Sequence, residues 1–136
     1  MNKKGFTLVE VLATIVLLSI LLMIAVPSVT TLQEKSNIKQ IEADAKVFIE
    51  LVRQKIESDT SINITVSREF KLEDIDITKL SSSNYDKTNS KVTASGCGYN
   101  STDVSDVYTC DTFEVVLEND SYEASGDTNN ITGSKK

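Results

Sequence analysis

Residues 3–27 have the sequence KKGFTLVEVLATIVLLSILLMIAVP, and this stretch decides the fold. From Phe6 to Val26 it contains 21 residues, and its polar side chains are those of Thr7, Glu10, Thr14 and Ser19. An α-helix of that length rises about 32 Å, close to the roughly 30 Å of hydrocarbon in a bilayer. The stretch therefore predicts a helix that crosses a membrane once.

Two lysines, Lys3 and Lys4, directly precede the apolar stretch. Short flanks that carry Lys or Arg stay on the cytoplasmic side of a membrane. We therefore expect a single-pass protein of the inner (cytoplasmic) membrane with its N-terminus inside. Everything after Pro27 would then lie outside.

The segment Gly5-Phe6-Thr7-Leu8-Val9-Glu10 resembles the processing site of type IV prepilins and the related pseudopilins. The resemblance implies that a prepilin peptidase cuts between Gly5 and Phe6 and that Phe6 becomes the N-methylated first residue. It also implies that Glu10 acts in filament assembly, and Pro27 matches the proline that the family places late in the apolar segment. The similarity covers about residues 1–30.

Two alternatives bear on this segment. An ordinary secretory signal is cut after its apolar region, next to small residues, but residues 23–27 supply only Ala25. The early cut is therefore preferred, and glycine suits it because it allows close backbone approach.

For Glu10, the simple alternative is a carboxylate that reaches headgroup water. The functional hypothesis is that Glu10 pairs with the Phe6 amine of a neighbouring subunit, since a charged group inside a membrane is a functional candidate.

The apolar periodicity continues beyond Pro27, which lacks an N–H and predicts a bend in a helix that crosses it. An apolar stripe recurs at steps of three and four: Ile38, Ile41, Ala45, Phe48, Val52 and Ile56. We therefore expect one helix from about Phe6 to Glu57. Its stripe would pack against the chain's own sheet, rather than on a membrane surface, because its charged face mixes both signs.

After the helix, alternating apolar residues predict a β-rich head. The expected strands comprise Ile62–Val66, continuing to Phe70, then Lys91–Ser95, and a hairpin from Phe113 to Ala124; residues 96–98 would form a turn. The fold class is α+β and pilin-like. The expected divisions are a leader (1–5), a transmembrane and polymerisation helix (6–27), an amphipathic helix (28–57), the head (58–124) and a disordered tail (125–136).

Two cysteines, Cys97 and Cys110, lie in the outside portion and predict a disulfide, with two free thiols as the alternative. Asp103 and Asp106 lie between them and Asp111 directly follows Cys110, so three carboxylates crowd the Cys97–Cys110 loop. Oxygen-rich loops can hold calcium, but no recognisable spacing supports a site there, so we expect no cofactor and no metal.

The composition excludes several functions. The chain has no histidine and hence no Ser-His-Asp or Cys-His catalytic set, and its five glycines match no nucleotide-binding fingerprint. The net charge is −6, and loss of Lys3 and Lys4 makes it −6 − 2 = −8. Nucleic acid phosphates attract clustered Lys and Arg instead. We expect neither enzymatic activity nor direct nucleic acid binding.

The sequence thus predicts a structural subunit of a type IV pilus-like filament. Its expected partners are a prepilin peptidase, other pilin subunits in a homo- or heteropolymer, an assembly platform protein and, indirectly, an assembly ATPase. Membrane lipid surrounds it before assembly, and an extracellular filament on the cell surface contains it afterwards. The alternatives are a pseudopilin of a competence or type II secretion system and, from another class, a monomeric membrane-anchored binding module.

Overall fold

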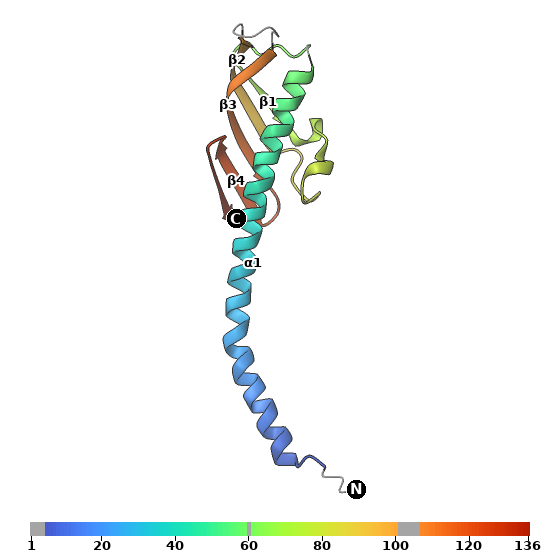
Figure 1. Cartoon of the computed structure of the whole chain (residues 1–136), viewed down its shortest axis with the longest axis vertical. Coiled ribbons are helices and arrows are strands. Elements are labelled where there is room, and N and C mark those ends of the chain that lie inside the picture. The colour runs from blue at the N-terminus through green and yellow to red at the C-terminus, as the bar shows by residue number, and fades with distance from the viewer. Residues whose placement is uncertain (1–4, 60, 101–106) are drawn as a thin grey trace. The chain divides into compact units, whose positions relative to one another are not determined.

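The computed structural model describes residues 5–59, 61–100 and 107–136. The chain divides into two compact units, Met1–Lys35 and Ser36–Lys136. One helix, α1 (Leu8–Ser58), supplies residues to both (Figure 1). The expected helix that continues past Pro27 is therefore confirmed. The bend at that residue stays a prediction.

The described part of the second unit contains a five-stranded antiparallel sheet in the order β1-β2-β3-β4-β5. The strands are β1 (Ser67–Lys71), β2 (Lys91–Asn100), β3 (Val107–Glu118), β4 (Tyr122–Asp127) and β5 (Asn130–Lys135). Two 3-10 turns, Leu72–Asp74 and Ile77–Lys79, follow β1. Together with α1, the sheet confirms the predicted α+β, pilin-like architecture.

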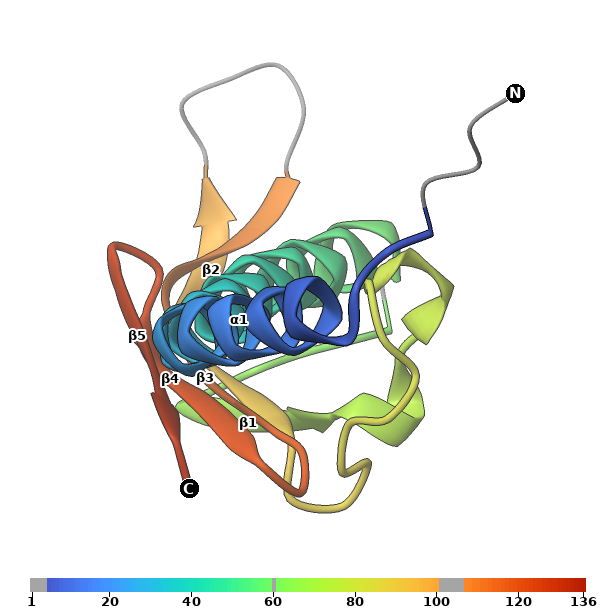
Figure 2. The ribbon, with the colours of Figure 1, turned by 90° about the horizontal axis from the view of Figure 1, so that it is seen from below.

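The core of the second unit lies between one face of α1 and one face of the sheet. In Figure 2 the strands lie around one side of α1, and the connection from β1 to β2 lies on another side. The helix contributes its apolar stripe, of which Ala45, Phe48 and Val52 are completely buried. The sheet contributes Phe70, Val92, Ala94, Phe113, Val115, Leu117 and Ala124, all buried.

The predicted hairpin between Phe113 and Ala124 is confirmed, since β3 pairs antiparallel with β4 and Leu117 lies opposite Ala124. The side-chain oxygen of Asn119 accepts hydrogen bonds from the backbone N–H groups of Ser121 and Tyr122, at 2.9 and 2.8 Å. Such a side-chain contact is a typical way in which Asn initiates a turn.

The strand expected over Ile62–Val66 is wrong, because pairing in the sheet begins at Ser67. Ile62 and Ile64 are buried as predicted, but Val66 is 80% exposed. The Tyr108 hydroxyl forms hydrogen bonds with both the N–H and the carbonyl of Ile64, each at 2.8 Å. A tyrosine side chain thus takes the backbone groups that a neighbouring strand would have used.

The turn expected at residues 96–98 is also wrong, because this segment lies inside β2. Cys97 is paired with Cys110 and Gly98 with Thr109 across the ladder to β3. Gly96 has φ +64°, a conformation that glycine adopts without steric cost. Glycine here accommodates a local backbone distortion within a continuing strand.

The disordered tail predicted for residues 125–136 is the third error, because these residues complete β4 and form β5. One Asp127 oxygen accepts hydrogen bonds from the N–H groups of Asn129 and Asn130, both at 2.8 Å. At Gly133, the backbone N–H donates to Glu42 Oε1 on α1 at 2.8 Å. Turn chemistry and this contact order a segment that is too polar to be recognised by its apolar content.

Gly133 allows β5 to approach the helix, which gives a testable prediction. A Cβ at this position would lie 2.9 Å from Ile38 Cγ2 and 3.0 Å from Glu42 Cγ. Gly133→Ala should therefore destabilise the chain by about 1–3 kcal/mol, because overpacking forces neighbours to move. Thermal unfolding in detergent measures the effect.

Gly98→Ala is the matched control, because a Cβ there meets no atom within 4 Å. It should lower the melting temperature less than Gly133→Ala does. Equal melting temperatures for the two variants would contradict the close packing of β5 on α1.

Candidate processing and assembly site

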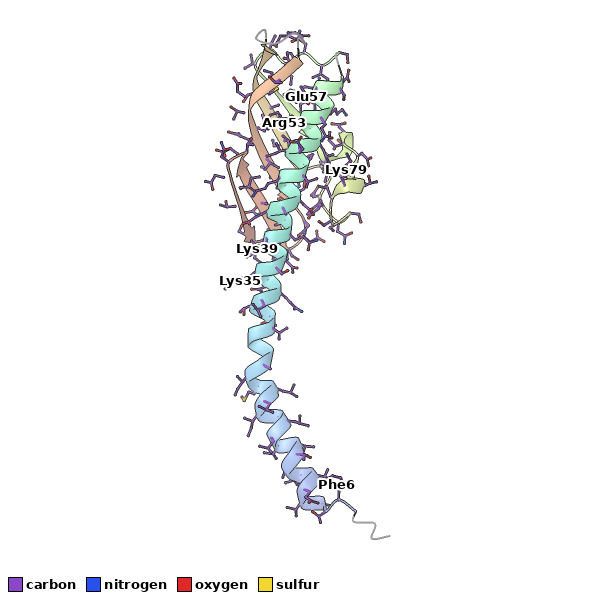
Figure 3. All side chains as sticks on the ribbon, viewed as in Figure 1. Phe6, Lys35, Lys39, Arg53, Glu57 and Lys79 are labelled. Atoms are coloured by element: carbon purple, nitrogen blue, oxygen red, sulfur yellow. A yellow bond between two sulfur atoms is a disulfide. The ribbon has the colours of Figure 1, made fainter. Side chains whose placement is uncertain are left out.

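The predicted cleavage site precedes the helix. Gly5 and Phe6 lie outside α1, and an added Cβ at Gly5 would meet no atom within 4 Å. The Phe6 side chain is 82% exposed and lies beside the beginning of the helix (Figure 3). A peptidase could therefore approach the bond between these residues without unfolding α1.

Thr7 and Glu10 form a reciprocal cap at the N-terminus of α1. The backbone N–H and the hydroxyl of Thr7 donate to Glu10 Oε2, at 2.8 and 2.9 Å. In return, the N–H of Glu10 donates to Thr7 Oγ1 at 3.3 Å. This is the capping box, in which each side chain satisfies a backbone donor that the helix leaves unpaired.

The first part of α1 is long and apolar enough to cross a membrane. An 18-residue window reaches a mean hydropathy of 2.8, and none of that window is buried inside the protein. The Thr14 hydroxyl donates to the Val11 carbonyl and the Ser19 hydroxyl to the Ile15 carbonyl, each at 2.7 Å. Glu10 is therefore the charged side chain of the apolar segment, whereas the hydroxyls of Thr14 and Ser19 donate hydrogen bonds to carbonyls of the same helix.

Comparison with known proteins supports the resemblance of the N-terminal segment to prepilins. Residues 1–26 match the family model described as a prokaryotic N-terminal methylation motif. This segment is of the type IV prepilin and pseudopilin kind. No curated protein and no solved structure matches the chain.

The motif supports a precursor of the prepilin type. It implies processing by a prepilin peptidase and assembly with other pilins, and it belongs to structural proteins rather than to an enzyme family. Together with the apolar first part of α1, it fits a precursor anchored in the membrane. The matched residues include the predicted cut after Gly5 and the carboxylate of Glu10.

The structure also places the predicted sites of the head. Cys97 and Cys110 form a disulfide between β2 and β3. Of the proposed calcium ligands, Asp111 is exposed on β3, whereas Asp103 and Asp106 lie outside the described residues. Within the described ranges, no group of three or more acidic, His or Cys side chains could hold a metal.

The sequence analysis did not predict that the carboxylate of Asp44 is buried. Asp44 lies on the core face of α1 and is 2% exposed. Its Oδ1 accepts hydrogen bonds from the N–H and the hydroxyl of Ser81, at 3.1 and 2.7 Å, and its Oδ2 accepts one from the Tyr85 hydroxyl. Burial and this contact raise the pKa of Tyr85, so the phenol stays protonated and keeps donating. Asp44 thereby fixes the connection between β1 and β2 to the helix.

The capping box of Thr7 and Glu10 and the buried Asp44 were not predicted, but both have a signal in the sequence. Thr7-x-x-Glu10 before an apolar run is the pattern of a capping box. Asp44 follows Ile41 by three residues and precedes Phe48 by four, which places it on the apolar stripe. The residues that receive or donate its hydrogen bonds, Ser81 and Tyr85, have no comparable signal.

Proposed function

We propose that this prepilin-type chain is a structural subunit of a type IV pilus-like filament. In this proposal it is stored in the membrane, cut after Gly5, N-methylated on Phe6 and polymerised through the first part of α1. The observation that carries the proposal is the exposed apolar surface of that segment, which remains attached to the head after the cut. Such a surface requires lipid or protein around it.

Glu10 would provide the specificity of assembly. Removal of the leader creates a positive amine on Phe6, four residues before Glu10. In a filament, the carboxylate of one subunit would pair with the amine of a neighbour. An unpaired carboxylate in an apolar surrounding is strongly unfavourable, so subunits in the wrong register would be rejected.

The remaining partners follow from this function. An assembly platform protein would collect the cut subunit from the membrane, and an assembly ATPase would act indirectly through that platform. The head would then lie outside the cell on the filament surface. A pseudopilin of a competence or type II secretion system, the alternative, would use the same N-terminal chemistry.

The proposal is tested with the full chain in cells that contain a prepilin peptidase and a pilus assembly system. An immunoblot of fibres sheared from the cell surface measures incorporation. We expect the chain in sheared fibres when the peptidase is active, and its absence from them when an inactive peptidase is supplied. A chain that is cut but stays in the membrane, even with the assembly system working, would instead be a solitary anchor and would contradict the proposal.

A further inference from the structure

A cavity of about 210 Å³ lies in the head where three segments meet. Its walls come from residues 37–41 of α1, from the connection between β1 and β2, and from the turn between β3 and β4. The N–H of Asp86 in the connection donates to the Glu118 carbonyl, just before the turn, at 2.8 Å. This hydrogen bond ties two of the walls together.

The inner side of the cavity is apolar and held in place. Ile41 of α1 and Tyr85 of the connection line it, and they are only 2% and 7% exposed. The Tyr85 hydroxyl donates to the buried carboxylate of Asp44, which keeps the ring in position. A surface that is ordered in advance contacts a ligand without a further loss of side-chain freedom.

The mouth of the cavity carries neutral hydrogen-bonding groups. Asn37 Nδ2 donates to the Tyr122 hydroxyl at 3.2 Å, from the helix to the first residue of β4. Asn119 uses its Oδ1 as the acceptor of the turn. Within the described ranges, no hydrogen bond is found for its Nδ2 or for the side-chain amide of Gln40. These two amides therefore retain donors, and Gln40 also an acceptor, that a ligand can use.

We propose that this cavity binds one neutral pyranose ring of a glycan. A pyranose has C–H groups on its ring faces and hydroxyls around its edge, which match the apolar inner side and the amides of the mouth. The residues that line the cavity carry no charge, so a charged ligand would lose its hydration without gaining a counter-ion. The cavity is also smaller than the roughly 300–1,000 Å³ of sites for drug-sized ligands, which favours a single ring.

A second hollow gives the glycan a direction in which to continue. It has a volume of about 220 Å³, shares Asn119 and Tyr122 with the cavity, and is also lined by Asn84, Asp120 and Ser121. The amide and the hydroxyl there suit the next ring. The exposed Asp120 carboxylate would repel an anionic sugar, which adds to the preference for neutral glycans.

Saturation-transfer NMR of the isolated full chain tests this proposal and does not depend on filament assembly. The chain is kept in a zwitterionic detergent, because a detergent with a sugar headgroup would compete. The probes are N-acetylglucosamine, glucose, galactose, the anion glucose 6-phosphate and a neutral blocked dipeptide. We expect transfer to at least one of the three neutral sugars, with a dissociation constant of about 1 mM, as is usual for so small a ligand. We expect none to glucose 6-phosphate.

Two substitutions each remove an amide from the mouth. Gln40→Ala deletes an exposed side chain, and Asn119→Asp removes the Nδ2 donor but keeps an oxygen that can accept the hydrogen bonds of the turn. Each should raise the dissociation constant of the neutral sugar about fivefold, the factor of one hydrogen bond. Circular dichroism should show melting temperatures close to that of the native chain.

Gln54→Ala is the matched control, because Gln54 is another exposed glutamine of α1 and does not line the cavity. It should bind the sugar like the native chain. The proposal is overturned by a lack of transfer to all three neutral sugars at concentrations well above the expected constant, or by transfer to the dipeptide alone. Equal transfer to glucose and glucose 6-phosphate would overturn it too, as would native binding by both Gln40→Ala and Asn119→Asp.

Discussion

Glu10→Ala should be cut after Gly5 like the native chain and should enter sheared fibres at about a tenth of the native level or less. Alanine removes the carboxylate that would pair with the Phe6 amine of the neighbour. It leaves the residues on both sides of the cleaved bond unchanged. The measurement compares the cut fraction in membranes with the amount in fibres.

Ser19→Ala is the control for this prediction. Its hydroxyl also lies in the apolar segment, but it donates to the carbonyl of Ile15 within the same helix. We therefore expect native incorporation for this variant. If Glu10→Ala is incorporated as well as Ser19→Ala, charge pairing does not direct assembly.

Asp44→Ala should destabilise the head by about 2–4 kcal/mol, because it leaves the buried hydroxyl of Tyr85 and the two donors of Ser81 without their acceptor. For a unit of this size, each kcal/mol lowers the melting temperature by roughly 4–8 °C. Thermal unfolding of the full chain in detergent, followed by circular dichroism, measures the loss. Cutting after Gly5 should be unaffected, since Asp44 lies in the other unit.

The matched control for Asp44→Ala is Asp120→Ala, which removes an exposed carboxylate. Surface substitutions of this kind usually change the free energy of unfolding by no more than about 0.5 kcal/mol. Equal melting temperatures for the two variants would show that the Asp44 network contributes nothing particular to the head.

The helix was predictable because its signals are local and repeated. Length, apolar content and the lysines before it indicate a membrane segment, and the stripe from Ile41 to Ile56 indicates the face that packs on the sheet. The cleavage motif is equally local. All of these features lie within a few helical turns, where periodicity and spacing are informative.

The errors arose where distant residues decide the structure. Ile64 would fit a strand, but the hydroxyl of Tyr108, 44 residues later, takes its backbone groups. The final strand has little apolar content, and Gly133 is ordered by Glu42, 91 residues earlier. The donors to the Asp44 carboxylate, Ser81 and Tyr85, come from a polar loop that lies 37 and 41 residues later in the chain. Sequence spacing does not reveal such pairings.

The central claim is that the apolar first part of α1 survives maturation and becomes the shared interior of a polymer. Mass spectrometry of the chain recovered from sheared surface fibres tests it most directly. We predict an N-terminal peptide that begins with methylated Phe6 and contains the whole apolar segment. A chain that begins after Ala25, or that retains Met1, would contradict the account.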